Sequence, residues 1–133
     1  MGTSSLKILF VDDSSVVRDM LESFLLELGY LNIENAEDGV DALEKIDSAD
    51  EDFDFIITDI NMPNMDGITF IQKVRDKFDY MSTPIMVLST EWTNEMKQKG
   101  KIAGATSWIV KPFDLILIKK GIEATLKRVN EEH

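Results

Sequence analysis

Cysteine is absent from the 133-residue chain, which excludes a disulfide framework, thiolate metal sites and cysteine nucleophiles. Cationic side chains are scarce, since 14 lysines and arginines stand against 25 acidic residues and the formal net charge is −11. This charge disfavours nonspecific binding to nucleic acid or anionic membranes, and it fits either solubility or the attraction of cations and basic partners. No apolar run is long enough for a membrane span, and MGTSSLKILF lacks a leader pattern, so a cytoplasmic location is expected.

The chain contains an alternation of short apolar runs with amphipathic segments. The runs are rich in Ile, Val and Phe, and most end in polar or turn residues, as strands buried on both faces do. They are Lys7–Val11, Phe53–Thr58, Ile85–Leu88 and Trp108–Val110, with a weaker one near Leu31–Ile33. We therefore expect five strands.

Between these runs, apolar residues recur with helical spacing. The first face comprises Val17, Met20, Leu21, Phe24, Leu25 and Leu28, and Gly29 is a candidate cap at its carboxyl end. The other faces comprise Val40, Leu43 and Ile46; Ile68, Ile71, Val74 and Phe78; and Leu115, Ile118, Ile122, Leu126 and Val129. A shorter, more polar helix is expected over Thr93–Ala103, and the last helix runs into the charged tail NEEH.

Five strands alternating with five helices predict a single α/β domain over residues 1–133, with its core at about 6–129. The crossovers make the strands parallel and place helices on both faces of one doubly wound sheet. No linker, internal repeat or low-complexity segment divides the chain. Ligands of such sheets bind beyond the carboxyl ends of the strands, so functional residues are expected at that edge.

Polar residues stand at the carboxyl ends of four predicted strands. They are Asp12 and Asp13, Asp59, Ser89 and Thr90, and Lys111 with Pro112. Taken alone, each has a structural explanation: an aspartate caps a helix or forms a turn, a serine binds loop backbone, and a lysine is a solvated charge. Together they place three carboxylates in one cluster, where mutual repulsion raises their pKa values unless a cation lies between them.

Mg²⁺ is the cation that this oxygen-rich cluster favours, because it takes carboxylate, water and phosphoryl oxygens in an octahedron. Asp13 and Asp59 are the natural ligands, Asp12 acts directly or through water, and the backbone carbonyl of Asn61 is a further candidate. The acids do not have the spacing of an EF-hand, which disfavours Ca²⁺. Phosphoryl transfer would account for a metal ion at this position. In such a reaction, Asp59 attacks the phosphorus atom, while Lys111 and a serine hydroxyl share the charge on the equatorial oxygens.

These residues also carry a resemblance to a known family. The segments FVDD at 10–13, DINMPNMDG at 59–67, VLST at 87–90 and GATSWIVKPF at 104–113 resemble the motifs of response-regulator receiver domains. The resemblance covers essentially the whole chain, and the combined spacing is specific although each motif alone is weak. It implies the flavodoxin-like strand order 2-1-3-4-5.

By this resemblance, Asp59 is the phosphoacceptor, and Asp12 and Asp13 hold Mg²⁺, for which Mn²⁺ is a substitute. Ser89 is the switch hydroxyl, and Lys111 contacts the phosphoryl group. The implied protein is not an enzyme with a separate substrate, because it assists only its own phosphorylation and dephosphorylation.

Trp108 occupies the position of the switch aromatic, where the family more often has Tyr or Phe. Thr90 is a further candidate contact of the phosphoryl group, and Lys111–Pro112 is a candidate cis peptide. Indole is larger than phenol and offers only a donor, so a permanently packed Trp108 is the alternative to a switch. Asn61 and Glu91 match residue types associated with fast self-dephosphorylation, with ordinary loop polarity as the alternative.

The resemblance also indicates the partners. About twenty residues follow KPF, so no output domain is expected and the output is contact with another protein. AEDGVDAL at 36–43 and NMPNMDG resemble the chemotaxis branch, which implies a histidine kinase as phosphodonor and a target such as the flagellar motor switch on the face of the fourth helix, fifth strand and fifth helix. Lys97, Lys99 and Lys101 make that face basic, either for an acidic partner or as a solvated surface. A monomer that binds neither nucleic acid nor membrane is expected.

Three other functions are alternatives: a receiver of a different phosphorelay, a haloacid-dehalogenase-type phosphatase and a flavodoxin-like nucleotide carrier. Such phosphatases carry the nucleophile on the first strand with a second acid two residues later, whereas here Asn61 stands two residues after Asp59. A nucleotide carrier would need a glycine-rich phosphate cradle, which the first loop, DDSSVV, lacks.

Overall fold

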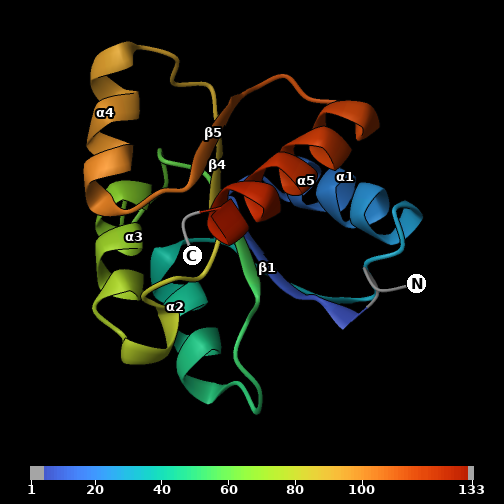
Figure 1. The fold of residues 1–133 in the computed structure, drawn as a ribbon, viewed down its shortest axis with the longest axis horizontal. Coiled ribbons are helices and arrows are strands. Elements are labelled where there is room, and N and C mark those ends of the chain that lie inside the picture. The colour runs from blue at the N-terminus through green and yellow to red at the C-terminus, as the bar shows by residue number, and fades with distance from the viewer. Residues whose placement is uncertain (1–4, 132–133) are drawn as a thin grey trace.

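The computed structural model describes residues 5–131, and its five strands form one parallel sheet in the order β2-β1-β3-β4-β5 (Figure 1). The strands are β1 Lys7–Val11, β2 Asn32–Ala36, β3 Phe55–Thr58, β4 Ile85–Ser89 and β5 Ser107–Val110. The predicted fold class and strand order are therefore confirmed. Residues 1–4 and 132–133, which end the predicted domain and its charged tail, lie outside the described residues.

Helices connect the strands and cover both faces of the sheet. They are α1 Ser15–Glu27, α2 Gly39–Ser48, α3 Gly67–Arg75, α4 Asn94–Ala103 and α5 Leu115–Glu131, and a short 3₁₀ helix, η2 Phe78–Tyr80, follows α3. Figure 1 shows α1 and α5 on one face of the sheet and α2, α3 and α4 on the other. This is the doubly wound arrangement expected for right-handed βαβ crossovers.

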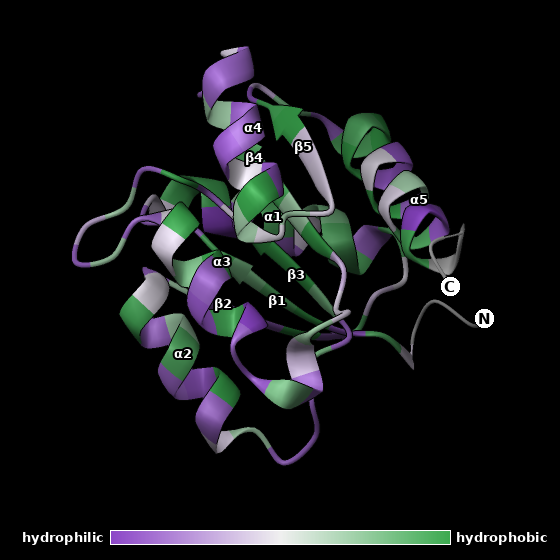
Figure 2. Cartoon of the chain, turned by 60° about the vertical axis from the view of Figure 1, so that its left-hand side comes forward, coloured by the Kyte–Doolittle hydropathy of each residue, from purple (hydrophilic) through white to green (hydrophobic). Residues whose placement is uncertain are grey.

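The apolar core has two parts because successive strand residues point to opposite faces of the sheet. In β1, Ile8 and Phe10 pack with α1 and α5, whereas Leu9 and Val11 pack with α2 and α3. Figure 2 shows β1 and β3 as apolar and the helices as mixtures of apolar and polar residues. Burial on both faces explains why the strands have continuous apolar sequences rather than alternating ones.

Several strand boundaries differ from the prediction, including that of β5, which starts at Ser107, one residue before the predicted Trp108. β2 extends to Ala36, beyond the predicted Leu31–Ile33, because it pairs along the whole of β1. β3 starts two residues after Phe53, whose backbone N–H donates instead to the Tyr80 hydroxyl at 3.0 Å. β4 includes Ser89, which was expected just beyond the strand. Pairing with neighbouring strands, which the apolar runs do not report, determines these ends.

Three residues assigned to buried helix faces are exposed. Met20 and Val40 each expose 40% of their surface, and Phe78 exposes 85%. Met20 and Val40 lie at the margins of their helical faces, and the small Ala42 is buried in α2 instead. Phe78 is exposed because α3 ends at Arg75, so that Phe78 begins η2 and does not continue the apolar face of α3.

The helix ends follow local capping signals. Gly29, with φ 96°, follows the cap residue Leu28 and ends α1 as predicted, since glycine adopts this left-handed conformation at low cost. The Thr93 side chain accepts a hydrogen bond from the Met96 N–H at 3.2 Å and starts α4. Within residues 5–131, none of the helices has both the length and the apolar composition that crossing a bilayer requires.

Candidate functional site

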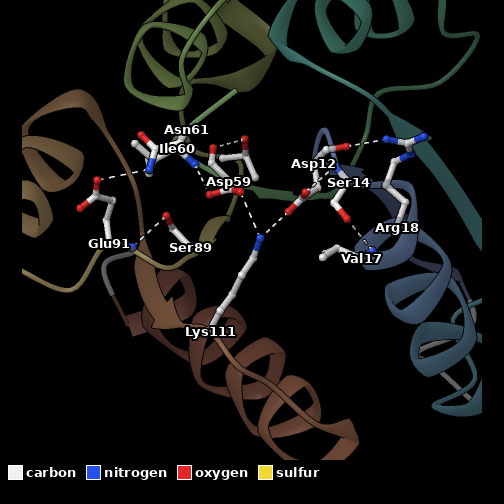
Figure 3. A network of polar contacts seen from close by, with 11 residues as sticks. Asp12, Ser14, Val17, Arg18, Asp59, Ile60, Asn61, Ser89, Glu91 and Lys111 are labelled. Carbon is white, nitrogen blue, oxygen red and sulfur yellow. Dashed lines mark hydrogen bonds and ion pairs between the residues drawn. The ribbon is translucent and has the colours of Figure 1, made fainter. Parts of the chain in front are cut away.

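The carboxyl edge of the sheet brings together the acids predicted to lie there, of which Figure 3 labels Asp12 and Asp59. β1 leads into Asp12 and Asp13, and β3 leads into Asp59. One carboxylate oxygen from each of the three lies within 4.8 Å of the others. Asp12 and Asp59 are buried, with 2% and 8% of their surfaces exposed, whereas Asp13 is exposed. The result is an acidic cluster that opens to solvent on one side.

Lys111, which follows β5, joins two of these acids. Its Nζ lies 2.7 Å from Asp12 Oδ2 and 3.1 Å from Asp59 Oδ2. Burial alone would lower the pKa of Lys111, but the hydrogen bond to Asp12 and the charge of Asp59 outweigh it and leave the pKa raised. Burial raises the pKa of the Asp12 carboxyl, and its bonds to Lys111 and to the Ser14 N–H oppose that rise. The ammonium therefore stays charged between two carboxylates.

Asp59 is held by the backbone as well as by the ion pair. The N–H of Ile60 donates to Asp59 Oδ1 at 2.6 Å, while Oδ2 lies toward Lys111. The Asp59 N–H donates to the Val11 carbonyl at 3.0 Å, which fixes the residue against the end of β1. Since all four residues of β3 are buried, the carboxylate is presented from a fully packed strand.

The loop after Asp59 turns back sharply toward the strand end. Asn64 has φ 67°, a left-handed conformation that asparagine tolerates, and its Nδ2 donates to Asp38 Oδ2 at 2.8 Å. The Gly67 N–H donates to the Ile60 carbonyl at 2.7 Å, and a Cβ at Gly67 would lie 2.1 Å from the Asp59 carbonyl oxygen. Only glycine permits this close backbone approach, so Gly67 allows α3 to start directly beside the acid.

Among the residues that follow β1, the serine caps the next helix and the two aspartates do not. Ser14 caps α1, because its side chain accepts from the Val17 N–H at 3.3 Å. Asp12 Oδ1 accepts from the Ser14 N–H at 2.9 Å, and Arg18 Nη1 donates to the Asp12 carbonyl at 2.7 Å. The explanation of Asp12 or Asp13 as the helix cap is therefore wrong, and both acids are left to the cluster.

Glu91 connects the polar residues of the site to Trp108. Its backbone N–H donates to Ser89 Oγ at 3.2 Å, and its carbonyl accepts from Trp108 Nε1 at 2.9 Å. Its side chain accepts from Asn61 Nδ2 at 3.2 Å through Oε1, which links the loops that follow β3 and β4 (Figure 3). Ser89 is fully buried and Trp108 half-buried. These four residues therefore form one connected group beside Asp59.

Two predicted residues lie at the border of this group. Thr90 is exposed between Ser89 and Glu91. The peptide bond between Lys111 and Pro112, the cis candidate, is cis in the structure. Neither observation assigns a chemical role, and that of Thr90 stays a prediction.

Sequence reasoning missed several residues that build the site. Arg18 and Gly67 act through backbone contacts and Asn64 through a side-chain hydrogen bond to Asp38, none of which apolar periodicity reports. Gly67 was recognisable in principle, because a glycine between an aspartate and a helical pattern often marks a close turn. Arg75, which lies away from this site, was missed as well: it donates to the carbonyls of Gly104, after α4, and of Tyr80, in η2, and their proximity appears only in the folded chain.

Known proteins resemble the chain along most of its length. A family model described as the response regulator receiver domain matches residues 8–123. The chemotaxis protein CheY1 of Helicobacter pylori is 39% identical over 121 residues, covering 91% of this chain and 97% of CheY1. The chemotaxis protein CheY of Pseudomonas aeruginosa is 36% identical over 125 residues, covering 94% of this chain and 99% of that protein.

Solved structures agree with these relatives. Vibrio cholerae CheY4 is 44% identical with a TM-score of 0.84, covering 90% of this chain and 98% of that one. A chain from the CheX-CheY-BeF₃-Mg²⁺ complex of Borrelia burgdorferi is 28% identical with a TM-score of 0.84, covering 91% and 89%. With this fold, this site edge and these relatives, the chain belongs to the response regulator receiver domain family and is CheY-like.

Proposed function

We propose that this chain is the phosphoryl-accepting receiver of a two-component chemotaxis relay, in which Asp59 takes a phosphoryl group from a histidine kinase. The observation that carries the proposal is the position of Lys111, whose Nζ contacts both Asp12 and Asp59 where Asp13 adds a third carboxylate. A nucleophile, an ammonium and a cluster of acids are the parts that phosphoryl transfer to a carboxylate requires. The CheY relatives support the chemotaxis assignment.

The three acids fit a hard divalent cation. Asp12, Asp13 and Asp59 offer carboxylate oxygens within 4.8 Å of one another, which is the donor chemistry that Mg²⁺ prefers. We assign Mg²⁺ to them, with Mn²⁺ as a substitute and the Asn61 carbonyl as a further ligand. Held by these residues, the ion would neutralise charge on the phosphoryl oxygens. The Borrelia burgdorferi complex, which contains BeF₃ and Mg²⁺, supports this assignment.

In the proposed reaction, a carboxylate oxygen of Asp59 attacks the phosphorus atom. The new O–P bond forms as the P–N bond to the kinase histidine breaks, and the histidine leaves with the bonding electron pair. Lys111 already lies 3.1 Å from Asp59 Oδ2, so its ammonium is placed to donate to a phosphoryl oxygen. Ser89 and Thr90 supply hydroxyls from the end of β4. The chain thereby acts on itself and not on a separate substrate.

Phosphorylation changes the chain through Ser89. To bind the phosphoryl group, its hydroxyl turns toward Asp59 and gives up the hydrogen bond from the Glu91 N–H. Because the carbonyl of the same Glu91 accepts from Trp108 Nε1, the loop after β4 transmits the change to the aromatic ring. Phosphorylation thus shifts a two-state equilibrium. The Asn61 side chain donates a hydrogen bond to the Glu91 carboxylate. In the proposal, these two side chains flank the path of the hydrolysing water and so tune the lifetime of the acyl phosphate.

The phosphorylated form binds its target, such as the flagellar motor switch, on the face of α4, β5 and α5. An open groove of about 820 Å³ lies there, with Trp108 and the cations Arg75, Lys97, Lys101 and Arg128 in its lining. On a chain of net charge −11, this basic groove suits an acidic target segment and a salt-dependent association. That the chain is a cytoplasmic monomer stays a prediction.

Intact-mass measurement tests the proposal most directly. Incubation with an acyl phosphate and Mg²⁺ is expected to add one phosphoryl group to the wild type and none to Asp59→Asn, and chelation of the metal is expected to prevent the addition. Asp19→Asn, which changes an exposed aspartate of α1, is the matched control and keeps the addition. An unmodified wild type, or a modified Asp59→Asn, contradicts the proposal. Turnover of a small phosphoester that Asp59→Asn leaves unchanged would indicate an enzyme instead.

A further inference from the structure

The side chain of Trp108 in β5 lies against α4, and its ring comes close to the helix backbone at Gly100. Its Nε1 donates to the Glu91 carbonyl at 2.9 Å, which fixes the pyrrole side of the indole. The ring also packs against the apolar cluster that includes Met96 and Ala103 of α4. The benzene side of the indole faces Gly100, where a Cβ would lie 2.6 Å from Cζ3 and 3.0 Å from Cε3.

Gly100 has no conformational reason to be glycine. It is buried within α4, between Asn94 and Ala103, and its backbone is helical. Glycine destabilises a helix interior relative to alanine, because it loses more backbone freedom on folding. Carbon atoms make van der Waals contact at about 3.5–4.0 Å, so an alanine at this position would overlap the indole. The space that the missing side chain leaves is therefore the space that the second ring of Trp108 fills.

We propose that Gly100 is a positioning residue for the switch aromatic: it admits the indole of Trp108 beneath α4 and so holds Nε1 against the Glu91 carbonyl. Gly100 and Trp108 are a size-matched pair, in which a smaller helix residue accommodates the larger aromatic. The regulatory meaning of this pair rests on the proposed function, where Trp108 is the element that responds to phosphorylation.

An added methyl group at position 100 has a specific consequence. It displaces the indole from its place against Gly100 and breaks the hydrogen bond to Glu91. The Ser89 hydroxyl is then no longer connected to the aromatic ring through the Glu91 backbone. Asp59 and Lys111 are not in contact with this pair and keep their arrangement.

A double-mutant cycle tests the size matching. Tyrosine lacks the atoms Cε3 and Cζ3, so Trp108→Tyr removes the overlap that Gly100→Ala creates. Gly100→Ala is expected to lower the thermal midpoint of the wild type and to raise that of Trp108→Tyr, where only the higher helix propensity of alanine remains. A change of the same sign in both backgrounds would overturn the proposal. Gln98→Ala, on the exposed side of α4, is the control and has equal effects in both backgrounds.

Fluorescence tests the position of the ring itself. The chain has two tryptophans, and Trp92 is 68% exposed, so Trp92→Phe leaves Trp108 as the sole reporter. In this background, Gly100→Ala is expected to shift the emission to longer wavelength and to increase quenching by acrylamide. Unchanged emission and quenching contradict the inference.

Phosphorylation separates this inference from the proposed function. Gly100→Ala is expected to accept a phosphoryl group by intact mass as the wild type does, while the Trp108 emission no longer responds to it. A response as large as that of Trp92→Phe alone would overturn the role of Gly100. A wild type that takes up no phosphoryl group would overturn the proposed function. The double-mutant cycle and the acrylamide quenching are measured without a phosphodonor, so they would still test the contact between Gly100 and Trp108.

Discussion

Strands β3 and β5 both deliver functional residues to the same edge, but they are built differently. All four residues of β3 are buried, and the strand pairs with β1 on one side and β4 on the other. All four residues of β5 are half-buried, and this edge strand pairs with β4 alone. β3 leads into the proposed nucleophile Asp59, whereas β5 carries Trp108 and leads into Lys111.

The difference matches what the proposed function asks of each residue. A reacting carboxylate needs a fixed position, because small displacements from the productive geometry are costly in phosphoryl transfer. A residue that reports phosphorylation needs two positions of similar free energy, and loosely packed elements supply them more readily than core strands do. On the proposed function, the nucleophile therefore follows the central strand, and the aromatic residue that responds to it lies on the edge strand.

Matched isoleucine truncations in the two strands give the largest expected contrast. Ile56→Ala in β3, where the side chain is fully buried, is expected to lower the free energy of unfolding by about 4 kcal/mol. Ile109→Ala in β5, where the side chain is half-buried, is expected to cost about 2 kcal/mol. Urea unfolding of both variants measures the difference. Equal losses would show that the edge strand is as tightly held as the central one.

Two glycine-to-alanine variants, for which the next largest losses of stability are expected, extend the comparison to the helices beside the two strands. A Cβ at Gly67 would meet the carbonyl oxygen of Asp59, a rigid backbone atom, at 2.1 Å. A Cβ at Gly121 of α5 would meet Cδ1 of Ile109 at 2.2 Å, which is the end of a flexible side chain. Gly67→Ala is therefore expected to destabilise by about 3 kcal/mol and Gly121→Ala by about 1 kcal/mol. A larger cost at Gly121, measured by the same unfolding curves, would reverse the assignment of rigidity.

The smallest expected effect concerns Asp38, which holds the loop after β3 through Asn64. Its pKa is lowered, chiefly by the Asp41 N–H and then by the Asn64 side chain. Because the folded pKa lies below the ordinary value of 3.8, Asp38 contributes stability above about pH 4 and loses it as the pH falls through the folded value. Asp38→Asn still caps α2, so its cost at about pH 6 is expected to be below about 1 kcal/mol.

The pH dependence distinguishes this role from simple capping. Between about pH 5 and pH 2.5, the free energy of unfolding of Asp38→Asn is expected to fall less than that of the wild type, since the titrating group is gone. Asp19→Asn, which removes an exposed aspartate of α1, serves as the control for the loss of a surface charge. Parallel curves for all three proteins would mean that Asp38 contributes nothing through its charge.

The sheet and most helices were predictable because burial on both faces leaves a strong local pattern. Runs such as Lys7–Val11 coincide with observed strands, and the α1 face contains the buried Leu21 and Leu25. The failures lie at positions that depend on neighbouring elements. Met20 and Val40 have the spacing of buried residues, but they lie at the margins of their helical faces and each exposes 40% of its surface.

The acids and the lysine of the site were predictable for a different reason. In a parallel sheet, topology alone brings the carboxyl ends of the strands together, so Asp12, Asp59 and Lys111 could be grouped without any knowledge of distances. The contacts that fix them could not be predicted. Gly67 against Asp59, and Gly100 against Trp108, depend on interelement spacings that a sequence does not state.

The ion pair between Lys111 and Asp12 joins residues 99 positions apart, and Lys111 follows Asp59 by 52 positions. On a ribosome that adds about 5–20 residues per second, the lysine is made roughly 3–10 s after the nucleophile. During this interval the nascent chain contains Asp12, Asp13 and Asp59 but not yet the Lys111 ammonium that pairs with two of them. On the proposed function, the chain can receive a phosphoryl group only after β5 has paired with the sheet. Incompletely folded chains are therefore not phosphorylated and send no signal.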